Sequence, residues 1–150
     1  MQFIASSIEN TFWYQEPVTE ELMATYPQMS RDKTILIVED DDQIGTILVE
    51  TLKQETQYYP ILVSDAWQAL EAVHNTRPCL LITDYCLPSM NGLELHDRLS
   101  AEQAYANIPT ILMSAFLPPA QEIRQRNLVA ISKPFELDEF LDKIDLLLAC

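Results

Sequence analysis

The chain has 150 residues, which suits one domain with a single hydrophobic core. Its 9 Lys and Arg residues against 23 Asp and Glu residues give a formal net charge of −14, which repels phosphate backbones and argues against nucleic-acid binding. Hydrophobic residues make up 48% of the chain, which excludes a disordered polymer, and no apolar run approaches the roughly 18 residues that a membrane-spanning helix needs. Because no Lys or Arg precedes Arg31, no secretory or transit signal is indicated, and we expect a cytoplasmic protein.

Residues 1–31 differ in composition from the rest of the chain. They carry four acidic residues before Ser30 and several aromatic residues, which is unusual for a disordered tail. Within them, "PVTEELMATY" favours a short helix capped by Thr19. We therefore expect an N-terminal extension over 1–31, either a docking element or an upstream start of little consequence, followed by one domain over 32–150.

Five short apolar runs follow the extension, and amphipathic segments alternate with them. The runs are continuously apolar, as in parallel strands that are covered on both faces. They span 34–38, 60–63, 79–83, 109–113 and 128–131. This alternation predicts an α/β fold, a doubly wound parallel sheet of five βα units with right-handed crossovers.

The amphipathic segments place their apolar residues on one helical face. The first, 43–55, carries Ile44, Ile47, Leu48 and Leu52 on that face; the second is 65–75; the last has a stripe of Leu137, Phe140, Leu141, Ile144, Leu147 and Leu148. Ahead of the fifth run, Pro118-Pro119 precedes only "AQEIRQRN", so the fourth helix is expected to be short or displaced.

Four consecutive acids, residues 39–42, end the first apolar run. We expect Asp42 to cap the first helix, because a carboxylate before a helix accepts from its free amides. No role is assigned to Asp41.

Polar side chains follow the first, third, fourth and fifth of the predicted strands, at the point where each strand ends. They are Glu39 and Asp40, Asp84, Ser114, and Lys133. Because ligand sites of open parallel sheets form beyond the carboxyl ends of the strands, we expect these side chains to meet. Crowded carboxylates need a hard cation such as Mg²⁺, a carboxylate can attack phosphorus, and an ammonium group neutralises a transferring phosphoryl. The set predicts a phosphoryl-transfer site.

The motifs at these strand ends closely resemble those of the receiver domain of two-component response regulators. The matching stretches are "VEDD" at 38–41, "TDYCLPSMNG" at 83–92, "SA" at 114–115 and "KPF" at 133–135. The resemblance covers about 33–148. It implies a flavodoxin-like (βα)₅ sheet with the strand order 2-1-3-4-5.

The resemblance also implies the roles of the acidic residues. Asp84 would be the phosphoacceptor. Mg²⁺ would be bound by Asp40, by Asp84 and by the backbone carbonyl of Cys86. Glu39 would act through metal-bound water.

The phosphoryl-binding roles follow from the resemblance in the same way. Lys133 would pair with the acceptor and then with the phosphoryl, which Ser114 and the backbone amide of Ala115 would hold after transfer. The Lys133–Pro134 peptide bond is expected to be cis. Gly92 is expected to relieve backbone strain in the loop after the acceptor.

The implied function is that of a stand-alone receiver, phosphorylated by a sensor histidine kinase or a phosphotransfer protein. It would signal to an unknown output protein by protein–protein contact, with no nucleic acid or membrane as partner and a homodimer left open. It would not be an enzyme, apart from Mg²⁺-dependent self-phosphorylation and autodephosphorylation.

The sequence departs from the family at the expected switch residues. Receivers usually carry an aromatic residue on the fifth strand, and here that position is Ala130. One alternative is therefore a constitutive interaction scaffold in which phosphorylation has no consequence. A haloacid-dehalogenase-like phosphatase fits poorly, because Cys86 stands where its second acid is needed, and "EDDD" would repel the phosphate of a flavodoxin-like cofactor.

Overall fold

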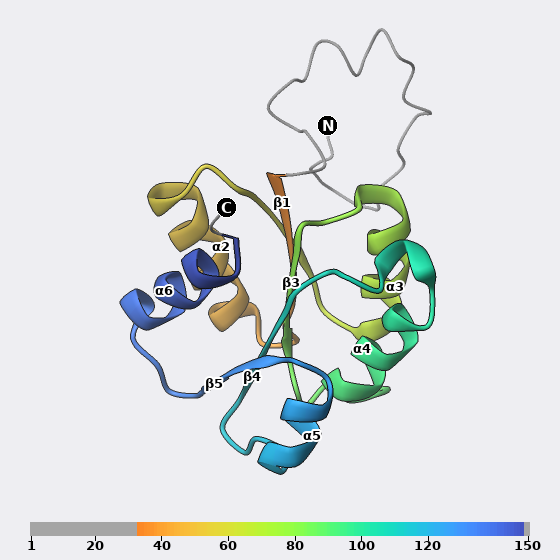
Figure 1. Cartoon of the computed structure of the whole chain (residues 1–150). Coiled ribbons are helices and arrows are strands. Elements are labelled where there is room, and N and C mark those ends of the chain that lie inside the picture. Colours follow the sequence, from red (N-terminus) through yellow and green to blue (C-terminus); the bar gives the residue numbers. More distant parts are fainter. Residues whose placement is uncertain (1–32, 149–150) are drawn as a thin grey trace, which may run out of the picture.

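A computed structural model of the chain describes residues 33–148 (Figure 1). The expectations for the extension over 1–31, including a helix capped by Thr19, lie outside the described residues. Within 33–148, no helix is both long and apolar enough to cross a membrane.

The described chain alternates strands and helices throughout. In chain order the elements are β1 (Thr34–Val38), α2 (Asp42–Glu55), β2 (Tyr59–Val63), α3 (Ala66–Thr76), β3 (Leu80–Asp84), α4 (Gly92–Ser100), the 3₁₀ turn η3 (Gln103–Tyr105), β4 (Thr110–Ser114), α5 (Ala120–Gln125), β5 (Val129–Ser132) and α6 (Leu137–Leu148). β1 has the predicted bounds, and each other strand begins and ends within one residue of its prediction, the usual uncertainty of element ends.

The strands form one parallel sheet in the order β2-β1-β3-β4-β5, which confirms the predicted doubly wound topology. Helices α2 and α6 cover one face of this sheet, and α3 and α4 cover the other (Figure 1). All carboxyl ends of the strands therefore point to the same edge of the sheet, where the site described below lies.

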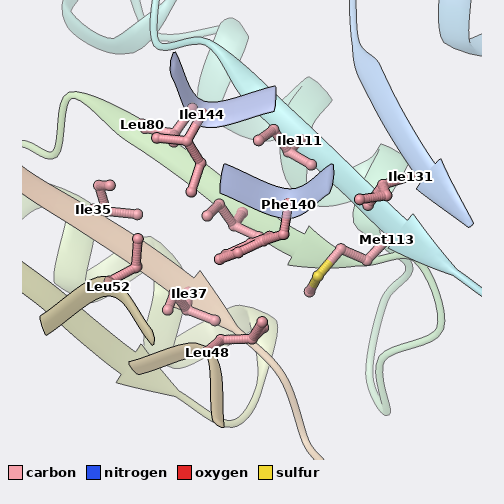
Figure 2. Close-up of a cluster of buried hydrophobic side chains, with 11 residues drawn as sticks. Ile35, Ile37, Leu48, Leu52, Leu80, Ile111, Met113, Ile131, Phe140 and Ile144 are labelled. Carbon is pink, nitrogen blue, oxygen red and sulfur yellow. The ribbon is translucent and has the colours of Figure 1, made fainter. Parts of the chain in front are cut away.

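One part of the core lies between the sheet and the helices α2 and α6. Phe140 and Ile144 of α6, with Leu48 and Leu52 of α2, pack against isoleucines and leucines of the strands, and all are 0–1% exposed (Figure 2). The ring of Phe140 also stacks on that of Phe135, with centroids 5.8 Å apart. This packing fixes α6, whose first turn follows closely on the fifth strand end.

Two residues of the predicted apolar faces lie largely outside the core. Ile47 of α2 is 52% exposed and Leu137 of α6 is 41% exposed, so the apolar face of each helix extends beyond the part that is buried. Ile47 lies about a third of a turn away from the line through Leu48 and Leu52 that meets the sheet. Leu137 is the first residue of α6, where the helix has only begun to pack.

The N-cap of α2 is Asp41 and not Asp42. The Asp41 carboxylate accepts from the amides of Gln43 at 2.9 Å and Ile44 at 3.1 Å. Asp42 is the first helical residue, where its charge meets the positive end of the helix dipole. The prediction was wrong by one residue because both positions carry an acid that suits a helix start.

The fourth crossover helix is short, as the two prolines predicted. Helix α5 has six residues, begins directly after Pro119, and has no buried residue.

Candidate functional site

Three carboxylates meet at the carboxyl edge of the sheet. Glu39 and Asp40 directly follow β1, and Asp84 is the last residue of β3, the strand next to β1. One oxygen of each of the three lies within 4.8 Å of the others. Glu39 and Asp84 are 1% and 7% exposed, whereas Asp40 faces solvent. The structure thus brings together the acids that the sequence assigned to one metal site.

Lys133 joins two of these acids. Its Nζ donates to Glu39 Oε1 at 2.7 Å and to Asp84 Oδ2 at 3.1 Å. The position of Lys133 is set by its backbone amide, which donates to the carbonyl of Ser114 at 3.0 Å, and the Lys133–Pro134 peptide bond is cis as expected. The pairing with Asp84 was predicted, but the shorter contact with Glu39 was not.

The electrostatics of this pair are those of buried opposite charges. Burial raises the pKa of Glu39, although the hydrogen bond from Lys133 and the amide of Asp41 act against that rise. Burial alone would lower the pKa of Lys133, but the hydrogen bonds to Glu39 and Asp84 outweigh it and leave that pKa raised. Lys133 is therefore an ammonium group that compensates two desolvated carboxylates.

The Asp84 carboxylate is also oriented from its own loop. Its Oδ1 accepts from the amide of Cys86 at 3.2 Å, so both of its oxygens have a named donor. That a carbonyl of Cys86 binds a metal stays a prediction.

Gly92 is required at the site by lack of space. A Cβ on Gly92 would lie 2.7 Å from the backbone oxygen of Asp84 and 2.8 Å from Cδ1 of Leu112. Its φ is not positive, so the expectation that glycine relieves backbone strain here was wrong. A side chain at this position would instead push against the backbone of the acceptor.

The hydroxyl of Ser114 lies beside this loop. Ser114 is 3% exposed, its Oγ accepts from the amide of Phe116 at 3.1 Å, and it lies 3.9 Å from the sulfur of Cys86. Ala115 follows at the exposed end of β4. The phosphoryl-binding roles of Ser114 and the Ala115 amide stay predictions.

Comparison with known proteins gives one family. The model of the response regulator receiver domain matches residues 35–145. Sporulation initiation phosphotransferase F of Bacillus subtilis is 33% identical over 116 residues, which cover 75% of this chain and 91% of that protein. The receiver domain of a signal transduction histidine kinase from Syntrophus aciditrophicus is 27% identical, with a TM-score of 0.71 over 78% of this chain and 90% of that one.

Some relatives are much longer proteins. The match to hybrid signal transduction histidine kinase D of Dictyostelium discoideum, 26% identical over 133 residues, spans 86% of this chain and 8% of that protein. The similarity there is confined to one domain.

The chain belongs to the response regulator receiver domain family. Acceptance of a phosphoryl group by an aspartate is the function of that family, and the alternative of a constitutive scaffold is not favoured.

Proposed function

We propose that this chain accepts a phosphoryl group on Asp84, with Mg²⁺, from a sensor histidine kinase or a phosphotransfer protein. The observation that carries the proposal is the ammonium of Lys133 between Glu39 and Asp84, with Asp40 in the same carboxylate cluster. In this arrangement Asp84 accepts from Lys133 with one oxygen and from the amide of Cys86, in the loop that follows β3, with the other.

The reaction is a displacement at phosphorus. A carboxylate oxygen of Asp84 attacks the phosphorus of a phosphohistidine, the new O–P bond forms as the P–N bond breaks, and the histidine nitrogen keeps the electron pair. Lys133 is poised to move its contact from the Asp84 carboxylate to the phosphoryl oxygens, where an ammonium group offsets developing charge. Ser114 and the Ala115 amide, at the end of the adjacent strand β4, would hold the phosphoryl after transfer.

The carboxylate set suits Mg²⁺. This ion prefers oxygen ligands and uses one or two carboxylates while keeping several waters. Asp40 and Asp84, with the Cys86 carbonyl, would bind it directly, and Glu39, which is held by Lys133, would act through water. Bound Mg²⁺ would neutralise phosphoryl charge during transfer.

Asp84→Asn is the variant that tests this assignment. Incubation of the parent chain with Mg²⁺ and acetyl phosphate is expected to give one phosphoryl adduct by intact mass, and the variant none, since an amide is not a nucleophile for phosphorus. Asp138→Asn, an exposed acid in the first turn of α6, is the matched control and should be labelled like the parent. Lack of an adduct on the parent, or equal labelling of Asp84→Asn, would reject the assignment.

The outer surface of α2 next to the site supports docking of the phosphodonor. Asp42, Gln43, Thr46 and Ile47 line a shallow depression in the first turns of this helix, which begins two residues after Asp40. An exposed isoleucine among polar groups suits a protein partner. These features support the proposal that the phosphohistidine-bearing domain of the donor docks on this surface.

Ile47→Ser is expected to separate docking from chemistry. Transfer from a phosphorylated histidine kinase or phosphotransfer protein that labels the parent should slow by roughly tenfold, because central apolar contacts carry much of an interface. Labelling by acetyl phosphate, which needs no docking, should not change. Leu146→Ser, a change of another exposed residue on α6, should alter neither rate. Equal slowing with both phosphodonors would contradict the docking role.

A further inference from the structure

We propose that Arg126 and Asp97 form a clamp, an ion pair that holds α5 against α4 in the unphosphorylated chain. Phosphorylation loosens α5 against the hold of this clamp. The regulatory half of this inference rests on the proposed function of Asp84. The structural half, that one ion pair determines how firmly α5 is attached, stands on the contacts alone.

Helix α5 has little other attachment to the domain. None of its six residues is buried. Its apolar contribution is the partly buried Ile123, which packs with Leu117 of the preceding loop against a small cluster of Leu93, Leu112 and Leu128. A segment with so few buried contacts opens at low free-energy cost.

The clamp is a two-pronged contact. Nε of Arg126 donates to Oδ1 of Asp97 at 2.8 Å, and Nη2 donates to Oδ2 at 2.9 Å. Its remaining Nη1 donates to the carbonyl oxygen of Glu122 at 2.9 Å and to the carboxylate of the same residue at 2.8 Å. The guanidinium therefore ties the first half of α5, its C-terminal end and the middle of α4 together.

The geometry makes this pair stronger than an ordinary surface ion pair. The side chain of Arg126 is 21% exposed and that of Asp97 is 50% exposed, but bidentate charge-assisted hydrogen bonds are the stronger kind. The hydrogen bond from Arg126 holds the pKa of Asp97 below its usual value, so the pair is charged at neutral pH.

The clamped helix is linked to the phosphoryl site along the chain and through the apolar cluster. Residues 115–119 connect Ser114 to the start of α5. Tyr85, the neighbour of Asp84, packs in the same cluster as Leu117 and Ile123. A shift at either strand end therefore displaces the surface on which α5 rests.

Strand β5 contributes little to holding α5 in place. Ala130 pairs with Leu112 in the sheet register and so lies on the same face as the cluster, where its methyl group offers little contact. The arginine fork and not a β5 side chain is the main tie of α5.

The test measures hydrogen exchange in residues 116–128 of the full chain, in Asp97→Ala and in Glu94→Ala. Glu94 is the matched control, because it pairs with Arg98 within α4 and does not reach α5. Unphosphorylated Asp97→Ala is expected to exchange about tenfold faster than the parent in this segment, and Glu94→Ala to match the parent. Equal exchange in the parent and Asp97→Ala would overturn the clamp.

The regulatory half is tested in the same chains with Mg²⁺ and acetyl phosphate. Phosphorylation of the parent is expected to raise exchange in 116–128, and Asp97→Ala is expected to form the adduct several-fold faster, because destabilising the resting state favours the other. An adduct on the parent with unchanged exchange, or equal rates of adduct formation, would overturn regulation through α5. Lack of any adduct would reject the role of Asp84 and this regulation together, while the exchange of unphosphorylated Asp97→Ala would still decide the clamp.

Discussion

Lys133→Met is expected to lower the free energy of unfolding of the metal-free protein by about 3 kcal/mol, because it leaves buried charge without a partner. Glu39 is 1% exposed and Asp84 7%, and the Lys133 ammonium is bound to both. Methionine keeps an unbranched side chain that is one atom shorter, and it removes the ammonium charge and its two hydrogen bonds. Urea unfolding in the presence of a chelator measures the loss.

The loss of unfolding free energy in Lys133→Met, called the deficit, should depend on pH and on the presence of Mg²⁺. The pKa of Glu39 is already raised above its ordinary 4.5 by burial, and the loss of the lysine hydrogen bond raises it further. A carboxyl group with a raised folded-state pKa favours folding below its unfolded pKa and loses that contribution as the pH rises through the folded value. The deficit should thus be small in acid and grow with pH, and Mg²⁺ should reduce it by supplying positive charge to the same acids.

Lys53→Met is the control for this variant. Lys53 is 57% exposed and its nearest carboxylate oxygen, on Glu50, is 3.9 Å away, so its removal should change stability by less than about 0.5 kcal/mol. Equal stability of Lys133→Met and the parent at neutral pH, or no response of the variant to Mg²⁺, would contradict the role given to Lys133.

Phe140→Ala is expected to cost about 3–5 kcal/mol of stability, through lost burial and the cavity that remains. Phe140 is fully buried between α6 and the sheet (Figure 2). Its ring also stacks on that of Phe135. A domain of this size is stable by only about 5–15 kcal/mol, so a large part of the margin disappears. Denaturant unfolding followed by far-UV circular dichroism measures it.

Leu146→Ala on the same helix is the matched control for Phe140→Ala. Leu146 is 70% exposed, and its truncation should change the free energy of unfolding by less than about 0.5 kcal/mol. A similar change of stability in both variants would contradict the packing role of Phe140, because alanine is the better helix former at both positions.

The sheet and the location of the site were predictable from the sequence. Continuous apolar runs of four or five residues mark strands buried on both faces, and the polar residue after each run falls at the carboxyl edge because all strands are parallel. The position of each residue after an apolar run was enough to predict that Glu39, Asp84 and Lys133 lie at this edge. The short α5 was likewise predictable, because Pro118 and Pro119 leave few residues before β5.

Some contacts between distant residues were decided only by the tertiary structure. The contact of Lys133 with Asp84 was predicted, but its shorter contact with Glu39, 94 residues away, was not. Glu39 lies within reach because β1 pairs with β3 in the sheet. The fork of Arg126 on Asp97 depends in the same way on how α5 lies beside α4.

Two further features, the exposure of an apolar helix residue and the identity of a helix cap, depended on packing and backbone geometry. A helical period tells which residues share a face but not where that face ends, so the exposure of Ile47 was settled by the angle at which α2 meets the sheet. Adjacent acids suit a helix start equally, so backbone geometry chose Asp41 over Asp42 as the cap. Residue order and strand direction suffice to predict which side chains meet at the carboxyl edge of the sheet. The partners, caps and exposed faces required the folded chain, because they depend on distances between residues that are far apart in the sequence.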